Sequence, residues 1–150
     1  MADLSQFLVR QAPASDDQIE QLVRDVGESL PEAYIGFLRI ANGVEGGPND
    51  QDGDSLRFLA IDEIIDFNEG YGVFSDLPQL LCFVSDGGDH AFAFDRSTAK
   101  DPNSWRIVHK PLGSPFAEDL IVIAENFQAW VEADFRYNIN QGEQVRALDS

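Results

Sequence analysis

The chain has 150 residues, of which 43% are hydrophobic, and this supply of apolar side chains excludes a disordered protein. A chain of this length folds without disulfides or metals, so we expect a single domain over residues 1–150, with its core at about 15–135 and a loose, polar C-terminal tail. Ten basic residues against 27 acidic ones give a net charge of −17, which disfavours binding to nucleic acids and anionic membranes because their phosphates are held by Lys and Arg.

Two helices are predicted near the N-terminus. Residues 15–18 (Ser-Asp-Asp-Gln) have the form of a capping box, and apolar residues then recur at helical spacing as far as Gly27, which ends the first helix. The second helix begins at Pro31, because proline suits a first turn, and residues 29–32 offer another capping box. Residues 42–43 (Asn-Gly) end it, so we expect a packed helix pair.

The middle of the chain predicts an acidic loop over residues 45–54 and then short strands at 56–61, 80–84, 90–95 and 105–109. Asp62 is expected to cap a short helix between the first two strands, and a hairpin turn, residues 86–89, joins the second strand to the third. A last helix is predicted over 118–135 from apolar residues at helical spacing. This order predicts an α+β fold, with an antiparallel or mixed sheet of about four to six strands packed with the N-terminal helix pair and the C-terminal helix.

Acids alternate with other residues at Asp50, Asp52 and Asp54 of the loop, a spacing that resembles a calcium-binding loop. An EF-hand-like loop that begins at Asp50 needs a glycine and a glutamate where Ser55 and Ile61 stand. A start at Asp52 brings Glu63 to the last position, but puts Arg57 where the glycine belongs. The pattern therefore favours a solvated acidic loop, and no metal or cofactor is predicted.

Two histidines, His90 and His109, lie in or next to predicted strands, where they could meet Ser85 and Asp86 in a hydrolytic triad. No spacing pattern supports such a site over chance, and an acid-rich turn is a poor phosphate loop. We therefore predict no catalytic residue and no enzyme, and keep a cryptic hydrolase as one alternative.

The single cysteine, Cys82, lies in an apolar run and has no partner for an internal disulfide or a zinc site. The N-terminus lacks the pattern of a secretory signal, and no apolar run approaches the roughly 20 residues that span a membrane. These features predict a cytoplasmic protein in a reducing compartment. No pattern specifies its oligomeric state.

Three segments resemble the signatures of the SUKH superfamily, in the family's order. They are residues 30–38 with 41–43 (LPEAYIGFL, ANG), residues 85–95 (SDGGDHAFAFD) and residues 124–131 (AENFQAWV). The resemblance implies a small α+β domain whose bacterial members are immunity proteins of polymorphic toxin systems and whose fungal relatives include a regulator of cell-wall assembly. It supplies no catalytic residues. The resemblance implies that the motif residues of the family stabilise the fold. The acidic loop over residues 45–54 is richer in acid than the family pattern requires.

The acids are concentrated between Glu45 and Asp95, where Arg57 is the single Lys or Arg. We therefore expect a protein-binding domain: an immunity protein that neutralises a cognate bacterial toxin, a basic nuclease-type effector, through an acidic surface. The alternative from the same superfamily is a regulatory or scaffold module, which would use an apolar patch. The residues predicted to contact the partner are Glu45, Asp50, Asp52, Asp54, Asp86 and Asp89.

Overall fold

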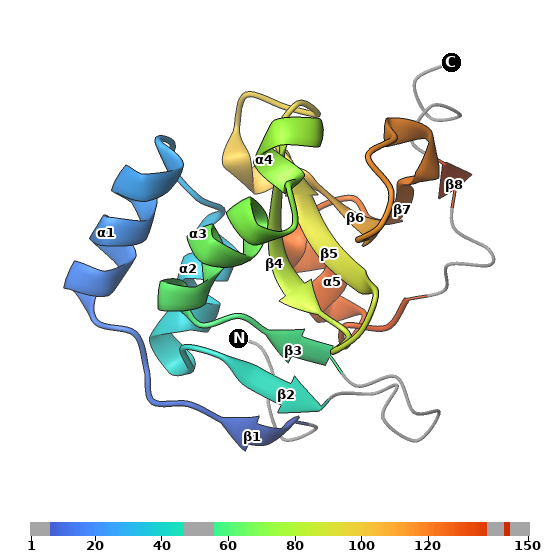
Figure 1. Ribbon diagram of the computed structural model, residues 1–150. Helices are drawn as coiled ribbons and strands as arrows, with labels where there is room; N and C mark the ends of the chain where they lie inside the picture. The colour runs from blue at the N-terminus through green and yellow to red at the C-terminus, as the bar shows by residue number, and fades with distance from the viewer. Residues whose placement is uncertain (1–6, 47–55, 138–142, 145–150) are drawn as a thin grey trace.

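The computed structural model describes residues 7–46, 56–137 and 143–144, and these form one sheet of eight antiparallel strands in sequence order. The α+β class with an antiparallel sheet is confirmed, but four to six strands was too few (Figure 1). The strands are β1 (Phe7–Arg10), β2 (Val44–Gly46), β3 (Leu56–Phe58), β4 (Leu80–Ser85), β5 (His90–Asp95), β6 (Arg106–Pro111), β7 (Ile121–Ala124) and β8 (Glu143–Gln144). The sheet thus extends beyond 15–135 at both ends, and β8 lies within the tail that was predicted to be loose.

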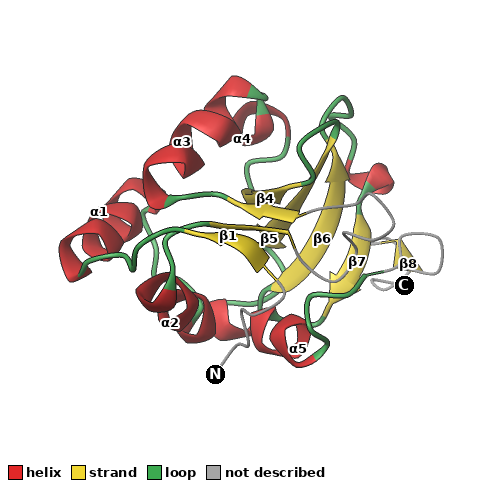
Figure 2. Ribbon diagram, turned by 90° about the horizontal axis from the view of Figure 1, so that it is seen from below, coloured by secondary structure: helices red, strands yellow, loops and turns green. Residues whose placement is uncertain are grey.

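Helices cover both faces of this sheet, as Figure 2 shows. The helices are α1 (Asp16–Val26), α2 (Glu32–Ile40), α3 (Ile61–Gly70), α4 (Val73–Asp76) and α5 (Phe127–Glu132). α3 and α4 lie on one face, α2 and α5 lie on the other, and α1 stands at one end beside α2 and α3. The predicted packing of the sheet with helices at the two ends of the chain is thus extended by α3 and α4, which cover the second face.

The helix pair begins with one predicted cap and one unpredicted cap. The Gln18 backbone N–H donates to the Ser15 hydroxyl and the Ser15 N–H donates to the Gln18 side chain, which confirms the first capping box. The second predicted box is wrong, because the Glu32 N–H donates instead to Asn103 Oδ1, at 2.7 Å. Asn103 is 71 residues away along the chain, so this cap forms only in the folded protein.

The helix predicted over residues 118–135 is wrong in its first half. Residues 121–124 (Ile-Val-Ile-Ala) form β7, and α5 begins only after Asn126, whose side chain accepts the Ala129 N–H at 2.8 Å. Three of these four residues are β-branched and therefore prefer a strand. Pairing with β6 satisfies the backbone hydrogen bonds of the segment in that conformation.

Two buried clusters lie on opposite faces of the sheet. The larger cluster, under α2 and α5, is rich in aromatic residues, and Phe83 and Phe94 stack in it at 4.0 Å between ring centres. The smaller cluster, under α3 and α4, includes Val73, Cys82 and Val108. Burial in it raises the pKa of the Cys82 thiol to about 12, despite the opposing charge of Lys110, so the thiol stays protonated.

Asn68 of α3 completes the sheet where β3 ends. Beyond Phe83, no strand among the described residues pairs with β4 on the β3 side, and the buried Asn68 side chain takes that place. Its Oδ1 accepts the Cys82 N–H at 2.8 Å, and its Nδ2 donates to the Cys82 carbonyl at 2.9 Å and to the Ile64 carbonyl at 2.8 Å. This contact fixes α3, which in turn positions one wall of the candidate site.

Candidate functional site

The strand register brings three of the predicted contact residues to one end of the sheet. Glu45 of β2 is paired with Arg57 of β3, which is paired with Ser85 of β4. The turn that follows Ser85 carries Asp86 and Asp89, so Glu45 lies two strands away from it. The other predicted contact residues, Asp50, Asp52 and Asp54, lie outside the described residues.

The β4–β5 turn holds its two acids differently. Asp86 Oδ1 accepts the Gly88 N–H at 2.8 Å and the His90 N–H at 3.3 Å, so this carboxylate is part of the turn itself. Asp89 is exposed, and its backbone carbonyl accepts the Leu112 N–H at 2.7 Å. Asp89 is therefore the freer of the two carboxylates to meet a partner.

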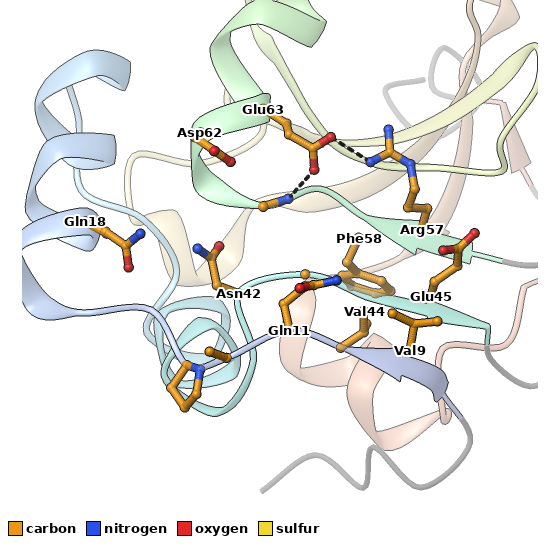
Figure 3. A pocket seen from close by; sticks show the side chains of 14 residues that line it. Val9, Gln11, Gln18, Asn42, Val44, Glu45, Arg57, Phe58, Asp62 and Glu63 are labelled. Carbon is orange, nitrogen blue, oxygen red and sulfur yellow. Dashed lines mark hydrogen bonds and ion pairs between the residues drawn. The ribbon is translucent and has the colours of Figure 1, made fainter.

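Next to Glu45, a cleft of about 580 Å³ lies between the outer face of β1–β3 and the first turns of α1 and α3. Figure 3 shows its walls: Val9, Glu45 and Arg57 come from the strands, Gln18 comes from α1, and Asp62 and Glu63 come from α3. Asp62 was expected only as a helix cap. The cap position is Ala60, so Asp62 is instead an exposed carboxylate in the first turn of α3.

Glu63 is the carboxylate of the cleft that an ion pair and a backbone hydrogen bond hold in place. Its Oε2 is 2.9 Å from Arg57 Nη1, and its Oε1 accepts the Ala60 backbone N–H at 3.0 Å. Burial alone would raise the pKa of this carboxyl, but the Ala60 N–H and the Arg57 guanidinium outweigh it, and the pKa is lowered. Glu63 is thus a fixed negative charge at neutral pH.

The first turn of α3 has its free N–H groups occupied from within the chain. Glu63 takes the Ala60 N–H, and Asn42 Oδ1 accepts the Ile61 N–H at 2.8 Å. A helix N-terminus binds anions through such groups, so this one has fewer to offer a phosphate. No local pattern in the sequence predicts this arrangement, because Asn42 is 19 residues from Ile61.

His90 and His109 pair with each other rather than with Ser85 or Asp86. His109 Nε2 lies 3.0 Å from His90 Nδ1, and the ring planes differ by 27°. His109 is 4% exposed, and its Nδ1 has no partner among the described residues. This favours the tautomer with the proton on Nε2, since a buried N–H without an acceptor is rare.

The pKa of His109 is lowered to about 4 by burial and by the neighbouring His90, against a smaller opposing effect of Asp86. His109 is therefore neutral at pH 7. In the described part of the chain, no three His, Cys, Asp or Glu side chains gather as metal ligands. Glu63, which stands at the last position of the calcium-loop pattern that begins at Asp52, forms an ion pair with Arg57.

A comparison with protein-family models matches residues 13–133 to the SMI1/KNR4 family, also called SUKH-1. The chain belongs to this family. The SUKH-1 domain is also similar to the uncharacterized protein YnaB of Bacillus subtilis (strain 168), with 24% identity over 120 residues, which cover 80% of this chain and 75% of that protein.

The residues that carried the resemblance are scaffold in this SUKH-1 domain. Leu30, Tyr34 and Phe37 are buried, and Tyr34 contacts the rings of Phe83, Phe94 and Phe127. The fold therefore explains the motif without assigning it chemistry.

None of the helices in the described part of the chain has the length and apolar composition that crossing a membrane requires.

A second hollow, of about 370 Å³, lies on the opposite side of the SUKH-1 domain, between α2 and α5. It is mostly apolar: Ala33, Phe37 and Ile40 line it from α2, and Val131 lines it from α5. Gly36 forms part of its floor, and a Cβ added there would meet no atom within 4 Å. This apolar groove is the kind of patch that a scaffold module would use.

Proposed function

We propose that this SUKH-1 domain is an immunity-type protein of the cytoplasm that binds and neutralises a basic toxin domain, such as a nuclease, through its acidic cleft and the neighbouring turn. The observation that carries the proposal is the grouping of Glu45, Asp62 and Glu63 in one cleft with a single guanidinium, that of Arg57. Family membership supports the proposal, since the resemblance implies a superfamily whose bacterial members are typically immunity proteins.

The physical basis is electrostatic complementarity. A nuclease presents Lys and Arg to hold phosphates, and a protein of net charge −17 is drawn to that surface and competes with the nucleic acid for it. Such charges raise the association rate and select the partner more than they add contact area. The exposed Asp89 and Glu45 are well placed for this role.

The test is co-expression with the toxin domain encoded beside this gene, with growth rescue and a measured Kd as readouts. We expect rescue, and a Kd that weakens about tenfold or more from 50 mM to 500 mM salt, because exposed charges are screened within about 10 Å at 0.1 M. Glu45→Lys with Asp89→Lys should abolish rescue, while Glu125→Lys with Glu132→Lys, at exposed positions near and in α5, should not. Absence of both binding and rescue would refute the proposal.

The apolar groove between α2 and α5 favours a second candidate, a regulatory or scaffold module. This function predicts binding that is insensitive to salt. Gly36→Gln should fill the groove without strain, since space for the side chain is open and the helix tolerates it. Loss of a partner by Gly36→Gln, with normal binding by Glu45→Lys, would support the second candidate over the first.

A further inference from the structure

An exposed phenylalanine, Phe116, stands on the loop between β6 and β7, residues 112–119. It is 58% exposed, more than any other large apolar residue in the described part of the chain, and it belongs to neither buried cluster. Figures 1 and 2 place this loop, with its short helical turn Ala117–Asp119, on the opposite side of the domain from α1. A single exposed apolar residue is common on a protein surface, so Phe116 matters only if the fold holds it there at a cost.

A buried ammonium group holds this loop from within the protein. Lys110 of β6 is 2% exposed, and its Nζ donates to the Pro111 carbonyl at 3.0 Å and to the Ser114 carbonyl at 2.6 Å. Although the chain has 27 acidic residues, none of the ion pairs among the described residues includes Lys110. Burying an ammonium without a carboxylate costs free energy that an apolar side chain of the same size would not cost. What the lysine gains in return is the position of the loop.

Further hydrogen bonds fix the backbone of Phe116 itself. Its N–H donates to the Ser114 hydroxyl at 3.2 Å, and that hydroxyl donates in turn to the Asp119 carboxylate. The Asp119 N–H donates to the Phe116 carbonyl at 3.2 Å, so the backbone of Phe116 is bonded on both sides. An apolar side chain on a fixed backbone loses less conformational freedom when a partner covers it, which is the property of an interface anchor.

The surroundings of the loop are acidic. The loop begins beside the β4–β5 turn, where the Leu112 N–H donates to the Asp89 carbonyl at 2.7 Å. Asp89 and Asp119 are exposed, and neither the turn nor the loop contains a Lys or Arg. A protein that covers Phe116 therefore meets carboxylates around the contact, and these favour Lys and Arg on the partner. An apolar centre with a charged rim is the usual anatomy of a protein interface.

We propose that Phe116 anchors the interface with the basic partner. Its ring enters an apolar socket on that protein, and Lys or Arg at the rim of the socket face Asp89 and Asp119. Lys110 is a positioning residue, because it holds the loop in the conformation that presents the ring. This inference rests on the proposed function, a domain that binds a basic protein, and deepens it by adding one apolar contact at a stated position.

The probe is the toxin domain encoded beside this gene, with its Kd for the full chain measured at 50 mM and 500 mM salt. Phe116→Ala should weaken binding by about tenfold or more, and by the same factor at both salt concentrations, because ions do not screen the burial of an apolar ring. Tyr71→Ala, at an exposed aromatic residue that ends α3, is the matched control and should leave the Kd within about twofold. A loss that shrinks at high salt would indicate a cation over the ring and would overturn the socket.

Lys110→Met tests the positioning role, because methionine keeps the length of the side chain and removes its ammonium. The Kd should weaken by about fivefold, and the amide hydrogens of Phe116 and Asp119 should exchange faster as their bonds in the loop open. The double variant K110M/F116A should bind no more than about twofold more weakly than F116A, since the loop then has no ring to present. Additive losses would overturn the role of Lys110. Ser114→Ala, which removes both hydroxyl bonds of the loop, makes the same test if Lys110→Met does not fold.

The two proposals fail in different ways. If the toxin domain binds the chain and Phe116→Ala weakens it no more than Tyr71→Ala does, the anchor is wrong while the proposed function stands. If the toxin domain does not bind the unaltered chain, the proposed function is refuted, and the anchor that rests on it is refuted with it. Both variants replace exposed side chains, and thermal unfolding with an unchanged Tm verifies that each is folded.

Discussion

Asn68→Leu should lower the free energy of unfolding strongly, although it keeps the branched shape of the side chain. Leucine keeps the branched heavy-atom skeleton of asparagine, although its two methyl groups fill more volume, and the three hydrogen bonds of the Asn68 amide are lost. The backbone N–H and carbonyl of Cys82 then lie buried without partners, because the Asn68 side chain is 0% exposed and water has no access there.

The expected cost follows from those two orphaned groups. Each buried polar group that loses its partner costs about 1–3 kcal/mol, so the free energy of unfolding should fall by about 2–6 kcal/mol. This is a large share of the roughly 5–15 kcal/mol that stabilises a typical domain. A loss of about 4 kcal/mol corresponds to a Tm lower by about 8–16 °C in a chain of this size.

Urea unfolding at pH 7, followed by far-UV circular dichroism, measures this loss. The matched control is Asn103→Leu, which also removes a side-chain amide that bonds a backbone group, the Glu32 N–H. Asn103 is exposed, so water replaces the lost bond and the cost should stay at about 1 kcal/mol or less. A change below about 0.5 kcal/mol for Asn68→Leu, or equal costs for both variants, would refute the reasoning.

Three further predictions concern stability. Tyr34→Phe should keep or raise stability, by up to about 1 kcal/mol in urea unfolding, because the buried Tyr34 hydroxyl has no partner among the described residues; a loss above about 1 kcal/mol would contradict this. His109 has a pKa of about 4 when folded and 6.5 when unfolded, so the stability that it contributes is complete above pH 6.5 and is lost as the pH falls toward 4. Unfolding at pH 7 and pH 5 should therefore show a loss of about 2 kcal/mol from this group, which His109→Phe removes; an unchanged pH dependence in the variant would count against it. Ser15→Ala should cost about 1 kcal/mol in urea unfolding by removing the cap of α1, while Ser29→Ala, at a predicted cap that does not form, should cost nothing measurable.

Elements whose signals are local were predictable from the sequence. The first helix has its cap, its apolar spacing and its final glycine within residues 15–27, and the structure confirms all three. The β4–β5 hairpin was predicted for the same reason, since two apolar runs flank a glycine turn. In both cases the residues that decide the structure are neighbours in the chain.

Elements that depend on distant partners were missed. β2 consists of Val44–Gly46, whose glycine and acid predict a loop, and it becomes a strand because β1 and β3 pair with it on either side. The cleft was missed for a related reason. Asp62 looked like a helix cap, and only the packing of α3 beside the strands makes it part of the cleft that Glu45 also lines. Of the three carboxylates that line the cleft among the described residues, the sequence had singled out Glu45, and the fold added Asp62 and Glu63.

On the proposed function, partner choice in this SUKH-1 domain rests on exposed acids rather than on the residues of the family pattern. The pattern residues Tyr34 and Phe37 are buried among aromatic rings, so their substitution changes the stability of the domain before it changes any surface. Glu45 and Asp62 are exposed, and neither is needed for a strand pair or a helix cap. Their charge can therefore change without cost to the fold, which is what a domain needs if relatives with one scaffold are to bind different proteins. On the proposed function, a relative with neutral or basic residues at these two positions should bind this chain's basic partner more weakly, however similar its core.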